Sequence, residues 1–214
     1  MAGYPIQLEI EDMPCAVIGG GSVALRKVRP LVKAGARVTV ISPVLADGLA
    51  ELAERGSIRH IARGYVAGDA DGYELVICAT DDGDINRQAA KEARALGALV
   101  NVIDAPEEGN FTVPSSVDIS PLLLTVSTGG ISPAFSRMMR QELTETYGAV
   151  HGAFLAKLGV WRDEVKDILP TPQAREAFWR SVLTRDVMKL LREGNLDKAE
   201  ESIQDAISSI RTES

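Results

Sequence analysis

The order of apolar and polar positions predicts an α/β unit in the first half of the chain. Residues 5–10 alternate between apolar and polar and predict a short, half-exposed strand. Runs typical of further strands lie at residues 15–20, 37–41, 57–63, 73–80 and 98–104. Apolar residues at helical spacing lie between them, at residues 22–35, 43–56 and 81–97. Because strands alternate with helices, we expect a Rossmann-like, doubly wound parallel sheet.

The pattern changes near residue 111 and predicts two further pieces. Residues 110–130 are β-rich with turn residues, and residues 132–148 form a helix with Pro133 in its first turn. Three helices are expected in the remainder, at residues 150–169, 172–194 and 195–210. The predicted domains are a nucleotide-binding domain at 1–113, a small α+β segment at 114–147 and a helical C-terminal domain at 148–214.

Composition narrows the functional classes. The chain has 214 residues and a formal net charge of -7, which argues against a nucleic-acid partner because such proteins present a basic face. We find no secretory signal and no run of about 18 apolar residues that would span a membrane. Cys15 and Cys78 lie in apolar strand-like runs and are expected to be small buried thiols. We therefore expect a cytoplasmic protein.

A glycine loop after the first buried strand predicts dinucleotide binding. Gly19, Gly21 and Ala24 form a G-x-G-x-x-A arrangement between a strand and a helix. Gly19 allows a tight turn, Gly21 lets a pyrophosphate approach the backbone, and the phosphates meet free N–H groups at the helix start. The predicted cofactor-binding residues here are Gly19, Gly20, Gly21, Ser22 and Val23. The alternative is a glycine-rich turn with a structural role only.

The second strand ends in Ser42 and Pro43, where dinucleotide sites usually carry an acidic residue for the adenosine ribose. A serine hydroxyl can still bond a ribose, although without the strength of a carboxylate. No arginine follows at once to hold a 2′-phosphate. We therefore predict NAD rather than NADP as the cofactor, with Ser42 and Pro43 at the ribose.

The ends of two later strands should border the same crevice. Thr80 and Asp81 are expected on the nicotinamide-ribose side, although Asp81 and Asp82 could simply cap the following helix. Asn101 and Asp104 follow at the end of the next strand. Because Asp104 leaves an apolar strand, we expect it to be partly desolvated and suited to proton transfer. The alternative for Asp104 is a turn-forming residue before Ala-Pro.

A polar, glycine-containing loop precedes the helix at 132–148. Ser127, Thr128 and Gly129 could offer amides and hydroxyls to an anionic substrate, together with Arg137 on the helix. The alternative is a turn in which Ser132 caps the helix.

Taken in order, these motifs resemble one enzyme family. "GGGSVALRK", "GARVTVISP", "ATDD", "NVID" and "VSTGGISP" are similar to segments of the precorrin-2 dehydrogenases of the sirohaem synthase family, over about residues 5–145. The resemblance implies a homodimer, with dimerisation at 114–147, that oxidises precorrin-2 to sirohydrochlorin with NAD⁺. It implies acid–base work by Asp104 and a tetrapyrrole site near Ser127, Thr128 and Gly129. From their positions in the sequence we also expect Asn101 and Arg137 to bind the substrate.

Some family members also insert Fe²⁺, so that a transient Fe²⁺ substrate and ferrochelatase activity are further expectations. His60 and His151 are isolated in the sequence and predict no resident metal site. Trp161 and Trp179 fall on apolar helix faces and are expected in a core. Two rival functions stay open: a regulatory NAD-sensing module without catalysis, and a chelatase without dehydrogenase activity.

Overall fold

A computed structural model of the chain describes residues 3–212. Contacts divide it into two compact units, Tyr4–Val113 and a second unit that begins at Pro114. Each unit is described by itself.

The first unit contains a five-stranded sheet in which every neighbouring pair is parallel. Its strands are β1 (Pro14–Ile18), β2 (Arg37–Ile41), β3 (Arg59–Ile61), β4 (Leu75–Cys78) and β5 (Leu99–Val102). Their order is β3-β2-β1-β4-β5, so the direction of chain progression reverses between β1 and β4. Ligands of such sheets bind outside the carboxyl ends of the strands at this switch point. The expected Rossmann-like fold is confirmed.

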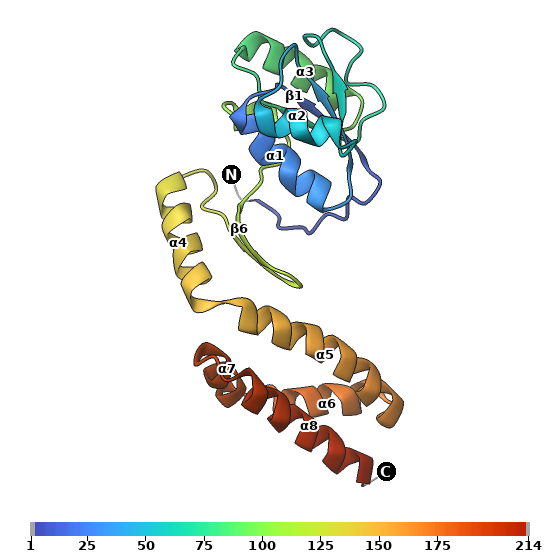
Figure 1. Cartoon of the computed structure of the whole chain (residues 1–214), viewed down its shortest axis with the longest axis vertical. Coiled ribbons are helices and arrows are strands. Elements are labelled where there is room, and N and C mark those ends of the chain that lie inside the picture. Colours follow the sequence, from blue (N-terminus) through green and yellow to red (C-terminus); the bar gives the residue numbers. More distant parts are fainter. Residues whose placement is uncertain (1–2, 213–214) are drawn as a thin grey trace. The chain divides into compact units, whose positions relative to one another are not determined.

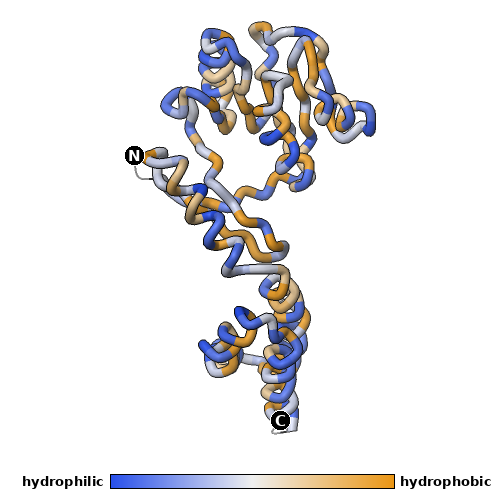
Figure 2. The backbone as a smooth tube through the Cα atoms, turned by 60° about the vertical axis from the view of Figure 1, so that its left-hand side comes forward, coloured by the Kyte–Doolittle hydropathy of each residue, from blue (hydrophilic) through white to orange (hydrophobic). Residues whose placement is uncertain are grey.

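Helices cover both faces of this sheet, and the alternation of side chains along β1 explains why. Cys15 and Val17 pack with α1 (Ser22–Lys33) and α2 (Asp47–Glu54), whereas Ala16 and Ile18 pack with α3 (Gly83–Ala95). Figure 1 shows α1 and α2 together in front of β1. Because both faces of the sheet are buried, the inner strands β1 and β4 are almost wholly apolar, and apolar residues colour much of the sheet orange in Figure 2.

One predicted strand is absent from the first unit, and one connection lacks a helix, as the sequence pattern indicated. Residues 5–10 form no strand and are largely exposed, so the strand prediction there is wrong. Their alternation finds no partner strand, and a strand needs one to satisfy its backbone groups. Between β3 and β4, residues 62–74 contain no helix. This segment, called here the crossover loop, packs Tyr65, Ala70 and Tyr73 against the sheet face that α3 covers.

The second unit begins with an antiparallel hairpin of β6 (Ser115–Ile119) and β7 (Leu122–Val126). Helix α4 (Pro133–Thr146) follows and contacts both strands. Ser132 caps α4, because its side chain accepts a hydrogen bond from the Phe135 N–H at 3.2 Å. The capping alternative is confirmed for Ser132.

The rest of the second unit is helical: α5 (Ala149–Ile168), α6 (Pro172–Val182), α7 (Arg185–Arg192) and α8 (Leu196–Thr212). Trp161 and Trp179 belong to its apolar cluster, as expected. The single helix predicted at 172–194 is wrong, because the chain breaks between α6 and α7 and Thr184 begins a new helix. Within residues 3–212, no helix is both long and apolar enough to cross a membrane.

Candidate functional site

The glycine loop joins β1 to α1, and its glycines have different surroundings. Gly19 has a φ of 120°, and a Cβ there would lie 2.3 Å from the Ala79 carbonyl oxygen. A Cβ at Gly20 would lie 1.9 Å from the Val44 carbonyl oxygen. Gly21 is exposed, and a Cβ there would have no atom within 4 Å. Gly19 and Gly20 are therefore required by the fold, whereas Gly21 keeps a space open in front of the backbone.

That open space lies at the N-terminus of α1. Gly21 is the N-cap residue, and it offers no side chain to the first-turn N–H groups. Among the described residues, the first turn of α1 contains no acidic side chain. The positive end of the helix dipole is therefore free to attract an anion, with Ser22 exposed beside it. This arrangement fits the pyrophosphate of a dinucleotide.

The Ser42 hydroxyl is engaged within its own loop. Ser42 is buried, and its Oγ donates to the Val44 carbonyl at 2.8 Å. The Ser42 carbonyl oxygen lies 2.9 Å from His60 Nε2. The Ala46 N–H donates to the Gly20 carbonyl at 2.7 Å. These bonds hold the segment after β2 against the glycine loop, so the geometry gives Ser42 a supporting position, while Pro43 is exposed.

Asn86 on α3 positions the segment after β4. Its Oδ1 accepts from the Thr80 backbone N–H at 3.2 Å and lies 2.8 Å from Thr80 Oγ1, while its Nδ2 donates to the Thr80 carbonyl at 3.0 Å. Asp82 caps α3 by accepting from the N–H groups of Asp84 and Ile85. The capping alternative is therefore confirmed for Asp82. Asp81 stays exposed.

Asp104 lies in a pocket of about 250 Å³, which also includes Thr80, Asp81 and Asn86. The expected desolvation of Asp104 by its own strand is wrong, because β5 ends at Val102 and Asp104 is exposed. An exposed carboxylate in a pocket can still accept a proton from a bound molecule. The structure thus brings Thr80, Asp81 and Asp104 together at the carboxyl ends of β4 and β5.

Asn101 lies inside β5, directly before Val102, which lines this pocket. Its side chain is buried, and Nδ2 donates to the Phe111 carbonyl at 3.1 Å. Among the described residues, Oδ1 finds no hydrogen-bond partner. Asn101 therefore holds residue 111 in place in this geometry and presents no exposed surface to a substrate.

The remaining predicted residues belong to the second unit. The Thr128 hydroxyl accepts from the Ser132 N–H at 3.2 Å and lies 3.0 Å from Ser136 Oγ. Ser127 Oγ accepts from the Gly129 N–H at 3.3 Å. Thr128 therefore organises the loop from inside, while Ser127, Gly129 and Arg137 are exposed.

Three polar residues that hold the backbone around the site were not among the residues predicted from the sequence. Asn86 is buried on the face of α3 that otherwise carries alanines, and an isolated amide on an apolar face was the available signal. Asn110 accepts from the Val100 N–H at 2.7 Å and donates to the Ala98 carbonyl at 3.1 Å, so its side chain pairs with the edge of β5. His60 is isolated in the sequence, but its Nε2 lies 2.9 Å from the Ser42 carbonyl oxygen in the structure.

The cysteines and histidines form no metal centre. In the described part of the chain, no group of three or more His, Cys, Asp or Glu side chains could hold a metal ion. Cys15 and Cys78 are free and buried, as expected. Burial, with a smaller effect of Glu74, raises the pKa of Cys15 to about 11. Burial, with a smaller effect of Glu108, raises the pKa of Cys78 to about 12.

Three successive regions of the chain match models of known protein families. A family model described as "Putative NAD(P)-binding" matches residues 6–115. A model for the sirohaem biosynthesis protein central region matches residues 121–146, and one for the sirohaem synthase dimerisation region matches residues 151–207. The match at 6–115 overlaps the segment 1–113, for which the glycine loop predicts dinucleotide binding.

Curated relatives agree with these models. The chain is 42% identical over 208 residues to a siroheme synthase of Methylobacillus flagellatus, covering 97% of this chain and 44% of the relative. It is 41% identical over 204 residues to a siroheme synthase of Thioalkalivibrio sulfidiphilus, covering 95% of this chain and 42% of the relative. The chain thus spans less than half the length of these relatives.

A solved structure shows the same fold. The chain is similar to SirC, a precorrin-2 dehydrogenase, with a TM-score of 0.79 and 20% sequence identity. The match covers 95% of this chain and 100% of that one.

Proposed function

The chain belongs to the sirohaem synthase family, and from this premise we propose that it oxidises precorrin-2 to sirohydrochlorin with NAD⁺. The observation that carries the proposal is the arrangement at one edge of the parallel sheet. The open, uncapped N-terminus of α1 fits a pyrophosphate. The pocket that includes Asp104 lies at the carboxyl ends of β4 and β5. A dinucleotide crosses such an edge at the switch point between β1 and β4.

The residues around the glycine loop hold the cofactor in this proposal. Backbone N–H groups of residues 20–23 bind the pyrophosphate, whereas the Gly19 N–H donates to the Ile41 carbonyl at 2.9 Å and fixes the turn. Pro43 borders the adenosine ribose. Thr80 and Asp81 border the nicotinamide ribose, and Asn86 fixes Thr80 for that purpose. NAD⁺, when bound, supplies the acceptor for a hydride.

Asp104 takes the proton in this proposal. Oxidation of precorrin-2 removes two hydrogens, one as hydride and one as a proton, so a base is needed for the second. Asp104 is exposed in the pocket and is free to meet a macrocycle that approaches from solvent. Asn101 contributes by holding residue 111 against β5, the strand whose end lines this pocket.

We assign the second unit to substrate binding and dimer formation. Ser127, Gly129 and Arg137 are exposed and could meet substrate carboxylates, with Thr128 shaping their loop. The family model that names dimerisation covers residues 151–207, and this match supports the homodimer. Four large apolar side chains are also exposed on the hairpin, the following loop and α4: Leu123, Ile131, Phe135 and Met138. A partner subunit would cover them.

The proposal is tested with the purified chain, precorrin-2 and NAD⁺, followed by the absorbance of sirohydrochlorin and of NADH. We expect both products, and a fall in turnover of roughly 10²–10⁴-fold in Asp104→Asn with unchanged NAD⁺ affinity. Glu107→Gln is the matched control, because Glu107 is exposed close by and lies outside this pocket. Unchanged turnover in Asp104→Asn would exclude Asp104 as the base.

The same assay separates the rival functions. NAD⁺ binding without any spectral change of precorrin-2 would favour a regulatory NAD-sensing module. Fe²⁺ enters as a substrate in a second arm, where sirohydrochlorin is the starting material. Faster iron insertion with the protein than without it would add ferrochelatase activity. A cytoplasmic location belongs to the proposal as well, supported by the two free thiols.

A further inference from the structure

Arg63 is the second residue of the crossover loop and lies beside Ser42, in the segment proposed to border the adenosine ribose. The carbonyl oxygen of Ile61, the last residue of β3, accepts from the Ser42 N–H at 3.2 Å and from the Arg63 N–H at 2.8 Å. The backbones of Ser42 and Arg63 therefore meet at one atom at the carboxyl edge of the sheet. An arginine near this position is what accommodates the 2′-phosphate in NADP-binding sites of this fold.

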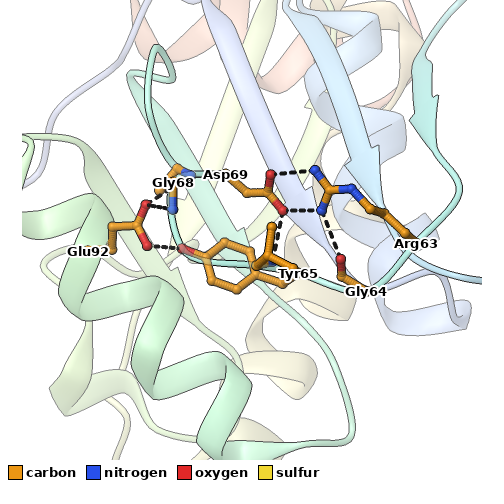
Figure 3. Close-up of polar contacts among 8 residues, drawn as sticks. Arg63, Gly64, Tyr65, Gly68, Asp69 and Glu92 are labelled. Atoms are coloured by element: carbon orange, nitrogen blue, oxygen red, sulfur yellow. Dashed lines mark hydrogen bonds and ion pairs between the residues drawn. The ribbon is translucent and has the colours of Figure 1, made fainter.

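The guanidinium of Arg63 is held by Asp69 in a two-pronged ion pair. Nη1 lies 2.5 Å from Oδ2, and Nη2 lies 2.7 Å from Oδ1, as Figure 3 shows. Nη1 also donates to the Gly64 carbonyl at 2.9 Å. The Arg63 side chain is 46% exposed, whereas that of Asp69 is 11% exposed. The cation thus reaches solvent, while its donors point back to the loop.

Asp69 is itself fixed. Its Oδ2 accepts from the Val66 N–H at 2.9 Å, which orients the carboxylate towards Arg63. The hydrogen bond from Arg63 is the main reason why the pKa of Asp69 lies below its ordinary value. The carboxylate is therefore ionised at neutral pH and neutralises the arginine.

A second anchor ties the crossover loop to α3. Glu92 accepts from the Tyr65 hydroxyl at 2.5 Å and from the Gly68 N–H at 2.8 Å (Figure 3). Tyr65 packs on the apolar cluster beneath, and burial followed by the bond to Glu92 raises the pKa of its hydroxyl. Because Gly68 precedes Asp69, Glu92 holds the residue next to the ion pair. Glu92 thus ties the loop to α3, whereas the ion pair itself is held by the two-pronged contact and by the Val66 N–H.

We propose that the ion pair between Arg63 and Asp69 sets the preference of this site for NAD over NADP. This inference rests on the proposed dinucleotide function. A 2′-phosphate beside Ser42 would approach the carboxylate of Asp69 and would have to compete with it for the guanidinium. The 2′-hydroxyl of NAD carries no charge, so it is not repelled by Asp69 and does not need the guanidinium of Arg63. Arg63 and Asp69 are specificity-determining residues that take no part in proton or hydride transfer.

The test measures the dissociation constants of NAD⁺ and NADP⁺ by calorimetry on the full 214-residue chain. Asp69→Asn keeps an oxygen for the Val66 N–H but removes the charge that neutralises Arg63. We expect the ratio of the NADP⁺ constant to the NAD⁺ constant to fall by roughly tenfold or more, as for a newly available charge-assisted contact. The double variant Asp69→Asn/Arg63→Gln should lose this improvement in NADP⁺ binding, because the guanidinium that would hold the 2′-phosphate is gone.

Two further variants keep the inference open to refutation. Glu92→Gln loosens the second anchor without neutralising Asp69, and it should leave the ratio unchanged. Arg63→Gln leaves Asp69 unpaired beside the 2′-phosphate, and it should raise the ratio. If the ratio fell in Glu92→Gln as much as in Asp69→Asn, the role of the ion pair would be overturned. An unchanged ratio in Asp69→Asn or in Arg63→Gln would overturn it as well. If the unmodified chain binds neither dinucleotide, the proposed function fails and the inference fails with it. If it binds NAD⁺ but the ratio is unchanged in Asp69→Asn and Arg63→Gln, only the inference fails.

Discussion

The buried side chain of Asn86 holds Thr80 by both its backbone and its hydroxyl. One amide oxygen faces the N–H and Oγ1 of Thr80, and the amide nitrogen donates to the Thr80 carbonyl at 3.0 Å. Thr80 follows β4 at the switch point of the sheet, where a dinucleotide is expected. Asn86 on α3 thereby fixes the backbone at Thr80, which lines the candidate site.

Replacing this amide should loosen the site. Asn86→Ala leaves the N–H and carbonyl of Thr80 without their partner, and unmet polar groups that are partly buried cost roughly 1–3 kcal/mol of unfolding free energy. We also expect weaker NAD⁺ binding. Urea unfolding and calorimetry measure the two effects. Gln88→Ala, exposed on the same helix, is the control and should change stability by less than about 0.5 kcal/mol. Equal effects of the two substitutions would contradict the role of Asn86.

Adjacent glycines should respond differently to alanine. Gly21→Ala adds a methyl group to open space, so it should cost at most about 1 kcal/mol of stability while weakening NAD⁺ binding. Gly20→Ala forces a Cβ against the Val44 carbonyl oxygen and should destabilise by roughly 1–3 kcal/mol or more. Thermal unfolding and NAD⁺ titration of both variants separate binding from folding. If Gly21→Ala bound NAD⁺ as the unmodified chain does, the pyrophosphate could not lie against Gly21.

Ser42→Ala tests whether the serine touches the cofactor. Its Oγ already donates to the Val44 carbonyl, so the substitution should cost about 1 kcal/mol of stability and change NAD⁺ affinity only slightly. A ribose contact would instead show as a clear loss of affinity for NAD⁺ that exceeds the loss of stability. Calorimetry at a temperature where both proteins are fully folded distinguishes these results.

His151 should make the second unit less stable in mild acid. It is 6% exposed, and neither ring nitrogen has a hydrogen-bond partner among the described residues. Burial, then the charge of Arg192, lowers the pKa of His151, while the Gly148 backbone opposes this shift. The neighbouring Tyr147 ring packs edge-on at 5.1 Å. The folded form therefore holds the imidazole neutral and resists protonation.

The sign of the pH effect follows. Above about pH 6.5 the imidazole is neutral in both forms and stability is unaffected. Below that value the unfolded chain binds a proton first, so stability falls until the lower pKa of the folded form is reached. The melting temperature should drop from about pH 7.5 to about pH 5.5, and His151→Gln should reduce that drop. If the melting temperatures of both proteins fell equally with pH, titration of a group other than His151 would cause the drop.

The helices and strands of the first unit could be predicted where their signals were local. Buried strands such as β1 and β4 read as apolar runs, and the glycine loop marks the turn between a strand and a helix. Residues 5–10 carry an equally local signal but form no strand, because pairing requires a neighbour that the sequence does not specify. The break between α6 and α7 was missed because the apolar spacing continues across it.

The sequence by itself determined the fold class, the glycine loop and the set of chemical groups available at the site. These depend on backbone freedom at Gly19 and on the periodicity of apolar residues, which act within a few positions. Only the tertiary structure decided which groups are free. It turned the Ser42 hydroxyl inward, left Asp104 exposed and committed Arg63 to Asp69. Such outcomes depend on atoms far apart in the chain, because a hydrogen bond or an ion pair is set by distance in space.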